Sequence, residues 1–449
     1  MNAERTTLFS DAPVRKAVLT LAIPTVISQL ITVVYNMADT FFIGKLNDPP
    51  QVAAATIVMP CFMLLTGFAN LFGLGGSSLI SRCLGSDNQE RARHCASFCI
   101  WTGAAIALLY GIAVVLLEPV LFPILGASAD TWEYCRQYAF WTIGIGAVPT
   151  VMNAELAHLI RAEGYSKPAG FGVAFGGILN IILDPIFIFV FRLNIQGAAI
   201  ATMLSNLIAM GYFLGFLYHI RRNSVITPNP KAFSVGEHIP AEVLSVGLPG
   251  FVMTMMSTIS NGALNHMVAG YSDTAIAGMG IAKKIDLLAY AIAQGMTQGT
   301  LPLIGYNYTA CDHKRMKAAI KTAFAYSFLV ACVGAVLLWT LAAPISRCFI
   351  ADTETVRYGQ HFLKIICLAC PTTAVNFMVI TVFQAIGKKI QPLCLSLLRK
   401  GSLDVVFMLI LNSAVGVSGI AWATPFADWI AFVISVALIV PQLKQLGSK

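Results

Sequence analysis

The stretch LAIPTVISQLITVVYNMADTFFIGKL, residues 21–46, decides the class of fold. No charged residue occurs between Leu21 and Met37, and a run of about 20 apolar residues is long enough to cross a hydrocarbon layer of about 30 Å. The one acid of the stretch, Asp39, would cost about 2.5–3.5 kcal/mol near the centre of a membrane helix. The stretch therefore predicts a transmembrane helix that keeps a carboxylate for a functional reason.

The composition extends this prediction to the whole chain. Of its 449 residues, 57% are hydrophobic and only 11% are charged, whereas soluble domains carry roughly 25% charged residues. An ordinary globular protein is thereby excluded, and an all-α polytopic membrane protein is predicted. The net charge of +8 comes from basic residues in loops, so it indicates membrane topology and no nucleic-acid partner. Because no cleavage site follows the first apolar segment, we expect that segment to stay as a helix.

Apolar segments divide the chain into twelve predicted spans. Most Lys and Arg residues fall in the even-numbered loops and at both termini, which predicts cytoplasmic termini. The other side has only Lys45, Arg136, Arg192, Arg347, Arg357 and Lys364. The spans are residues 17–43, 52–80, 95–117, 138–160, 168–191, 197–220, 243–270, 275–305, 319–342, 360–385, 391–412 and 417–441.

The chain also repeats itself. A shift of 225 positions lays LAIP (21–24) on VGLP (246–249), and GAAIAT (197–202) matches GIAWAT (419–424) with small gaps. A repeat of six spans gives two lobes related by a pseudo-twofold axis along the membrane normal, with a cavity between them. We expect an N-lobe over residues 1–220, a flexible cytoplasmic linker over 221–240 and a C-lobe over 241–449.

Acids inside spans are functional candidates, and two of them lie at matching depth. Asp39 and Asp184 are each roughly 7–11 Å below the outer boundary, at 1.5 Å per residue. Thr202 reaches a similar depth, and Asn180 lies one turn below Asp184. Pro185 is expected to kink its helix and turn backbone oxygen inward. Such an oxygen-only cluster suits a proton or a hard cation such as sodium, so a sodium site at these four residues is a candidate.

Structural explanations of the same residues stay open. Asp39 could cap a helix end or extend to the outer interface, and Asn180 and Thr202 could simply join helices through hydrogen bonds. In the second lobe, the repeat places Asp404, Asp428 and Thr424 on Asn180, Asn206 and Thr202, so Asp404 and Asp428 form a weaker polar site. Asp404 has Lys400 one turn earlier, which equally favours a structural ion pair. For Glu155, a local contact with His158 is favoured.

Sequence motifs argue against an enzyme. The chain has no Walker A motif, no HExxH and no GxSxG, and its seven His residues lack metal-ligand spacing. We therefore expect no catalytic residue and no cofactor beyond a coupling ion.

Taken together, these segments resemble the MATE (multidrug and toxic compound extrusion) family, in its DinF-like or MepA-like branch. The resemblance covers nearly the whole chain. It rests on residues 21–46, on GFANLFGLGGSSLISRCLG (67–85), on RAEGYSKPAGFGVAFGGILNIILDPIFIF (161–189), on GAAIATMLSN (197–206), and on QGTLPLIGYNY (298–308) and FQAIGKK (383–389).

The resemblance implies two six-helix lobes with a V-shaped central cavity. It also implies export of organic, often cationic compounds by alternating access, driven by inward protons or sodium. In this branch the coupling ion binds in the first lobe, at positions that match Asp39, Asn180, Asp184 and Thr202, and the first helix can bend near Pro24. The acids that NorM-like members carry in their seventh and tenth helices are absent here, which shifts weight onto the first lobe.

Tyr35, Asn36, Met253 and Met256 are weaker candidates for contacts with substrate in the cavity, because aromatic and thioether groups suit organic cations. We expect a monomer in the plasma membrane, with lipids and small organic molecules as its partners. The alternative within transport is a flippase for lipid-linked precursors, which would need a markedly basic cavity. A receptor or scaffold would not need polar residues at matched depth in three helices.

Overall fold

A computed structural model describes residues 3–350 and 352–445, and every regular element among them is helical. The N-lobe contains six predicted spans, two of which are divided into segments. Its elements are α1 (Ala3–Ser10), α2 (Val14–Gly44), α3 (Pro49–Gly85), α4 (Gln89–Ile124), α5 (Ala129–Ala139), η1 (Phe140–Ile145), α6 (Ala147–Ala162), α7 (Ser166–Pro185), η2 (Ile186–Val190) and α8 (Asn194–Ile220).

The C-lobe follows the same order from α2 onward, with an additional short helix, α12, and a further α-helical segment, α16, after its second interrupted span. A segment with the short helix η3 (Pro230–Ala232) connects it to the N-lobe. The C-lobe elements are α9 (Ile239–Val268), α10 (Asp273–Thr309), α11 (His313–Thr340), α12 (Ala342–Phe349), α13 (Thr353–Ile366), η4 (Cys367–Ala369), α14 (Cys370–Ala385), α15 (Ile390–Ser396), η5 (Leu397–Leu403), α16 (Asp404–Val415) and α17 (Val417–Gln445).

Nine helices among the described residues are long and apolar enough to cross a membrane, or ten when α5–η1 and α6, bent by 49°, count as one span. The two remaining predicted spans are α10 and the column from α15 to α16. Both carry charged residues in their interior, among them Lys283, Asp286 and Arg399. The two-lobe arrangement of twelve transmembrane helices is confirmed, with these two spans more polar than the others.

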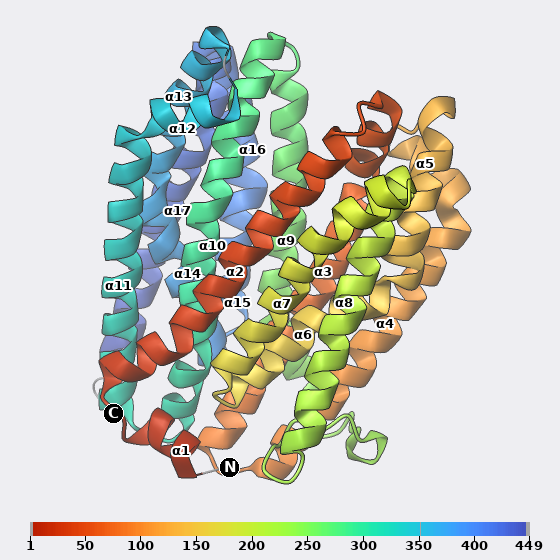
Figure 1. Cartoon of the computed structure of the whole chain (residues 1–449). Coiled ribbons are helices and arrows are strands. Elements are labelled where there is room, and N and C mark those ends of the chain that lie inside the picture. The colour runs from red at the N-terminus through yellow and green to blue at the C-terminus, as the bar shows by residue number, and fades with distance from the viewer. Residues whose placement is uncertain (1–2, 351, 446–449) are drawn as a thin grey trace.

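Figure 1 shows the helices in two groups that diverge toward the end where α2 finishes. One large and one small buried core lie in the N-lobe, and two lie mainly in the C-lobe. The first half of α2 joins the C-lobe core, where Val18 and Leu21 pack with residues of α10 and α11. Further along, α2 packs on α7 of its own lobe. Helix α2 is therefore shared between the lobes.

The two lobes approach most closely where α3 crosses α9. A Cβ atom on Gly75 would lie 2.1 Å from the carbonyl oxygen of Val243, and one on Gly247 would lie 1.8 Å from that of Leu71. No side chain larger than hydrogen fits at either position. The backbones of α3 and α9 are therefore in direct contact, and this pair of glycines is called the glycine crossing below.

The segment between the lobes, residues 221–238 of the linker predicted over 221–240, lies along the N-lobe. Its Ser224 hydroxyl donates to Glu163 Oε2 at 2.5 Å, and the Val225 amide donates to Glu163 Oε1 at 2.9 Å. Ser97 donates to the carbonyl oxygen of Asn229 at 3.0 Å. Helix α1 and the end of α17 lie at the same end of the molecule as this segment (Figure 1), which we call the linker end.

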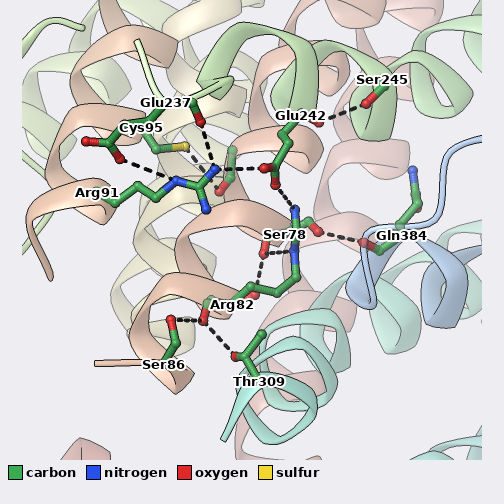
Figure 2. A network of polar contacts seen from close by, with 12 residues as sticks. Ser78, Arg82, Ser86, Arg91, Cys95, Glu237, Glu242, Ser245, Thr309 and Gln384 are labelled. Atoms are coloured by element: carbon green, nitrogen blue, oxygen red, sulfur yellow. Dashed lines mark hydrogen bonds and ion pairs between the residues drawn. The ribbon is translucent and has the colours of Figure 1, made fainter. Parts of the chain in front are cut away.

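An ion-pair cluster joins the lobes at the linker end (Figure 2). Glu242, in the first turn of α9, lies between Arg82 of α3 and Arg91 of α4. Its Oε2 is 3.1 Å from Arg82 Nη2, and its Oε1 accepts from Arg91 Nη2 at 2.7 Å. Thr309 of α10 donates to the Arg82 carbonyl oxygen at 2.7 Å. Arg82, Arg91 and Glu242 are called the linker-end latch below.

No ion pair among the described residues joins the lobes at the opposite end. Side-chain hydrogen bonds between lobes reach only the middle of the molecule, where Gln29 donates to Gln298 at 2.8 Å and Asn70 donates to Thr254 at 3.1 Å. The structure therefore holds its lobes together from the middle to the linker end.

Candidate ion-binding site

Three residues of the predicted layer lie together between α7 and α8 of the N-lobe. Asn180 and Asp184 are one turn apart on α7, and Thr202 is on α8. Asn180 Nδ2 donates to Asp184 Oδ1 at 3.3 Å and to Thr202 Oγ1 at 3.3 Å. All three residues are buried. Their side chains form one polar layer inside an apolar lobe.

Asp39 reaches this layer from α2. Its charge interacts with that of Asp184, and both carboxylates interact with the hydroxyls of Tyr35 and Tyr138. The Asp39 side chain is partly exposed, but its Oδ1 atom is enclosed. The structure thus brings together all four residues that the sequence proposed for a cation, from α2, α7 and α8. These four residues are called the N-lobe layer below.

The N-lobe layer has more acceptors than donors. Asp39 Oδ1, Asn180 Oδ1 and Asp184 Oδ2 are enclosed without a hydrogen-bond partner. No Lys or Arg among the described residues forms an ion pair with Asp39 or Asp184. Buried polar atoms normally have partners, and two adjacent carboxylates repel each other when both are ionised. A proton or a hard cation would supply what the layer lacks.

Hydrogen bonds continue from Thr202 deeper into the N-lobe. Asn206 donates to the Thr202 carbonyl oxygen at 3.0 Å, and Asn153 of α6 donates to Asn206 Oδ1 at 2.8 Å. Asn180, Thr202, Asn206 and Asn153 therefore form a chain of uncharged groups, which we call the N-lobe ladder. The acids Asp39 and Asp184 lie at one end of this ladder.

The C-lobe contains a ladder at the corresponding positions. The internal repeat places Asp404, Thr424, Asp428 and Asn376 where Asn180, Thr202, Asn206 and Asn153 stand. Thr424 donates to Asp404 Oδ1 at 3.2 Å, and Asn376 donates to the Asp428 carbonyl oxygen at 3.0 Å. These four residues are called the C-lobe ladder. It uses the same four positions as the N-lobe ladder but replaces two amides by acids, and Asn376 donates to a backbone carbonyl where Asn153 donates to a side chain.

Each acid of the C-lobe ladder has a basic partner. Lys400 Nζ lies 3.5 Å from Asp404 Oδ2, which also accepts from Ser260 at 2.6 Å. Arg399 donates through Nε to one Asp428 oxygen and through Nη2 to the other, the second at 3.4 Å. Arg399 and Asp428 are both buried, with 2% of each side chain exposed. Asp404 therefore stands in an ion pair, the structural alternative that the sequence left open.

An enclosed cavity lies beside this ladder, between α10, α11, α14, η5 and α17. Arg399 and Lys400 line it, as does Asp286, which has no hydrogen bond or ion pair among the described residues. Lys283, one turn before Asp286, donates to Thr424 at 3.3 Å. Three basic and three acidic side chains thus meet in the C-lobe interior: Lys283, Arg399, Lys400, Asp286, Asp404 and Asp428.

The predicted substrate-contact residues do not form one surface. Met253 is buried in the C-lobe, where its sulfur accepts from the Tyr290 hydroxyl at 3.8 Å. Met256 packs against η5, since its sulfur would lie 2.7 Å from a Cβ on Gly401. Tyr35 packs on α7, and Asn36 beside it is exposed. The two methionines and the two N-lobe residues therefore lie in different environments.

The two prolines behave differently. Pro24 lies within α2, which the structure describes as one helix from Val14 to Gly44, and its carbonyl oxygen faces Gly170 of α7. At Pro185, by contrast, the α-helical pattern of α7 ends, and the chain continues as the π-helical segment η2. A second π-helical segment, η5, carries Arg399 and Lys400 just before Asp404. Such segments are often found at functional sites.

The predicted contact between Glu155 and His158 is wrong. His158 Nδ1 lies 3.2 Å from Arg161 Nη1, whereas both Glu155 oxygens are buried without a hydrogen-bond partner. His158 is only three positions from Glu155, and its ring faces Gly73 of α3 instead. After Asp39 and Asp184, Glu155 is thus the third acid inside a predicted N-lobe span that has no basic partner.

Sequence reasoning missed Arg399 as a site residue. The signal was available, because two adjacent basic residues inside an apolar span are costly and need partners. It also missed Asn153. The alignment of residues 161–168 with residues 384–392 in the internal repeat places Asn153 on Asn376, so both lobes have an Asn at this position.

The MatE family model matches residues 24–186 and 249–410, one match in each lobe. The chain belongs to the MatE family. Among its relatives, the multidrug export protein MepA of Staphylococcus aureus (strain MSSA476) is 28% identical over 439 residues, which cover 98% of this chain and 96% of that protein. MepA of Staphylococcus saprophyticus is also 28% identical over 439 residues, with the same coverage of both chains.

Solved structures of MATE proteins share the fold over the full length of both chains. A MATE crystal structure in complex with MaL6 has a TM-score of 0.91 at 23% identity. An outward-facing multidrug resistance MATE family transporter of the MOP superfamily has a TM-score of 0.90 at 24% identity. The predicted family and fold are confirmed, and the MatE chain is a multi-pass membrane transporter, not an enzyme.

Proposed function

We propose that this MatE protein exports amphipathic organic compounds, many of them cationic, in exchange for protons or sodium ions that bind the N-lobe layer. The proposal is carried by one observation: Asp39 and Asp184 share a buried layer that contains no basic side chain. A cation from solution is the missing counter-charge. The relatives named multidrug export proteins support the substrate class.

Helix α2 provides a physical route from the layer to the lobe interface. It carries Asp39 near one end, and its other half packs on α10 of the C-lobe. Neutralising the layer changes the electrostatic free energy of the packing between α2 and α7. A change in the position of α2 then alters the contacts between the lobes, as alternating access requires.

The linker end is inferred to be the cytoplasmic end, because most loop Lys and Arg residues fall on that side of the predicted topology. The linker-end latch would close the protein toward the cytoplasm in this state. The ion would load from the opposite side, near Asp39. We place the protein in the plasma membrane as a monomer.

The alternative of a lipid-precursor flippase gains one observation, because Arg399 and Lys400 line a cavity in the C-lobe. Each of these residues is paired with an acid, Asp428 or Asp404, so the cavity does not carry the excess positive charge that a pyrophosphate group needs. Drug export therefore remains the proposal.

The test is transport of a fluorescent organic cation in proteoliposomes, with a pH gradient and a sodium gradient imposed separately. Asp39→Asn and Asp184→Asn should each abolish ion-driven transport while the protein remains folded. Asp130→Asn, an exposed acid in the first turn of α5, is the matched control and should transport like the wild type. Normal ion-driven transport by both layer variants would overturn the proposal.

A further inference from the structure

The C-lobe ladder is a charged copy of the N-lobe ladder, and its charges are balanced from within. In the N-lobe, Asn180 and Asn206 are neutral amides, and the acids come from Asp39 and Asp184 beside them. In the C-lobe, the equivalent positions are the acids Asp404 and Asp428 themselves. Both lobes therefore bring two carboxylates to the same part of the fold, but by different residues.

The counter-charges differ in origin. Asp404 has Lys400 at 3.5 Å, and Asp428 is held by two nitrogens of Arg399. These cations are side chains of η5 and cannot leave the site. In the N-lobe no side chain occupies the corresponding place. A soluble cation can exchange during a transport cycle, whereas a covalently attached one cannot.

Packing explains why the N-lobe lacks such a cation. The repeat aligns Lys400 with Gly176 and Arg399 with Phe175. A Cβ on Gly176 would lie 3.0 Å from Ala209 Cβ and 3.8 Å from Asn153 Nδ2, so a lysine there would need α8 to shift by a few tenths of an ångström. Phe175 is exposed at the surface of the lobe. Packing at Gly176 and the outward position of Phe175 thus disfavour, in the N-lobe, the two basic side chains that the C-lobe contains.

We propose that Lys400 and Arg399 are built-in counter-cations that occupy the C-lobe counterpart of the ion site permanently, so that only the N-lobe exchanges an ion during transport. This inference rests on the proposed function of the N-lobe layer. It assigns to Lys400 a role in setting how many ions move per substrate. The corollary is that removal of Lys400 opens Asp404 to a proton or sodium ion from solution.

Other charged groups around Asp404 set the background of such a measurement. Three of these groups come from α10: Lys283, Asp286 and the hydroxyl of Tyr290. All three interact electrostatically with the charged side chains of η5 and α17. From η5 and α17 come Arg399 and Asp428. Lys283 donates to Thr424 and remains after Lys400 is removed. Its positive charge would repel the extra cation at Asp404 and weaken the binding of that ion.

The experiment measures the coupling stoichiometry in proteoliposomes. A fixed gradient of fluorescent organic cation is opposed by a varied pH or sodium gradient, and the ion gradient that stops net flux gives the number of ions per substrate. Lys400→Met should raise that number by one. Lys400→Arg should keep the wild-type value, and so should the double variant Lys400→Met with Asp404→Asn, because the exposed carboxylate is gone.

A second measurement covers a Lys400→Met protein that folds but transports too slowly. The melting temperature of the purified protein in detergent is recorded against sodium concentration and pH. Wild-type protein should show one ion-dependent rise, which Asp39→Asn removes. Lys400→Met in the Asp39→Asn background should show a new rise, and the further Asp404→Asn change should remove it.

Two results would overturn the inference. One is a Lys400→Met protein with unchanged stoichiometry and no new ion-dependent stabilisation, which would make the pair purely structural. The other is loss of an ion from the stoichiometry in Asp404→Asn alone, which would make the C-lobe an exchanging site. The proposed function fails by a different result, namely ion coupling that survives Asp39→Asn and Asp184→Asn.

Discussion

The N-lobe layer and the C-lobe ladder are two solutions to the same problem, the burial of carboxylates inside a membrane protein. The N-lobe leaves Asp39 and Asp184 without a basic partner, and three enclosed oxygens have no hydrogen bond. The C-lobe surrounds Asp428 with Arg399, Thr373 and a ring contact between Arg399 and Phe377 at 4.5 Å. The N-lobe site has no basic partner for its two acids, and the C-lobe ladder has one for each of its acids; they are called the incomplete and the complete site below.

The difference teaches how a duplicated fold becomes asymmetric. Both lobes keep an Asn that donates to the equivalent helix: Asn153 donates to the Asn206 side chain on α8, and Asn376 donates to the backbone carbonyl of Asp428 on α17. The charges on that scaffold are what changed. A site that needs an ion responds to ionic gradients, and a site that carries its own ions contributes a fixed structure instead.

The largest effect should come from breaking the complete site. Arg399→Met would leave Asp428 buried and unpaired, and loss of one partner of a buried ion pair costs about 3–5 kcal/mol. We expect the melting temperature in detergent to fall sharply. The double variant with Asp428→Asn should recover much of the loss. A single variant as stable as the wild type would show that the C-lobe pair is not the buried counter-charge described above.

The shared scaffold should contribute less to stability in either lobe than the buried ion pair does in the C-lobe. Asn153→Ala removes one side-chain hydrogen bond, and Asn376→Ala removes two, to Asp428 and from Ser435. At about 1 kcal/mol per bond, the free energy of unfolding should fall by about 1 and about 2 kcal/mol respectively. Thermal unfolding of the two variants in the same detergent measures both changes. An Asn153→Ala loss greater than that of Arg399→Met would reverse the comparison.

The incomplete site should gain stability when its charge is removed. Asp184→Asn keeps an acceptor for Asn180 but relieves the repulsion with Asp39, so without sodium at neutral pH the protein should be stabilised by roughly 1 kcal/mol. Sodium or acid should stabilise the wild type and have little effect on the variant. Destabilisation of the size expected for Arg399→Met would indicate a hidden partner for Asp184.

The smallest effect concerns the two ends of the molecule. Glu242→Gln removes both ion pairs of the linker-end latch, which are partly exposed and contribute about 0.2–1 kcal/mol each. Distances between spin labels across the opposite end should shift in population by roughly two- to thirtyfold toward the state opened at the linker end. Glu133→Gln, whose partner Arg136 lies in the same lobe, should change nothing. Equal shifts in both variants would contradict a role for the latch.

Much of this arrangement could be predicted from the sequence, because hydropathy reports the spans and residue counts report depth. Depth alone indicated that Asp39, Asp184 and Thr202 share a layer. Depth does not report the direction in which a side chain points around its helix. Arg399 and Asp428 are 29 positions apart in the sequence and lie on different helices. Their pairing could therefore be found only in the structure. The same limit explains why Glu155 was assigned to His158 and why Met253 was assigned to a cavity.

The glycine crossing of α3 and α9 has a mechanical consequence. With the carbonyl of Leu71 1.8 Å from where a Cβ on Gly247 would be, the two backbones cannot come closer, so they can rotate about this point but not slide through it. Helix α9 extends about 30 Å beyond Gly247 toward the opposite end, at 1.5 Å per residue. A rotation of about 10° would then displace its far end by about 5 Å while the crossing itself hardly moves. Two glycine hydrogens, each against a carbonyl oxygen of the other helix, thus let a small angular change move the far end of α9 by several ångströms.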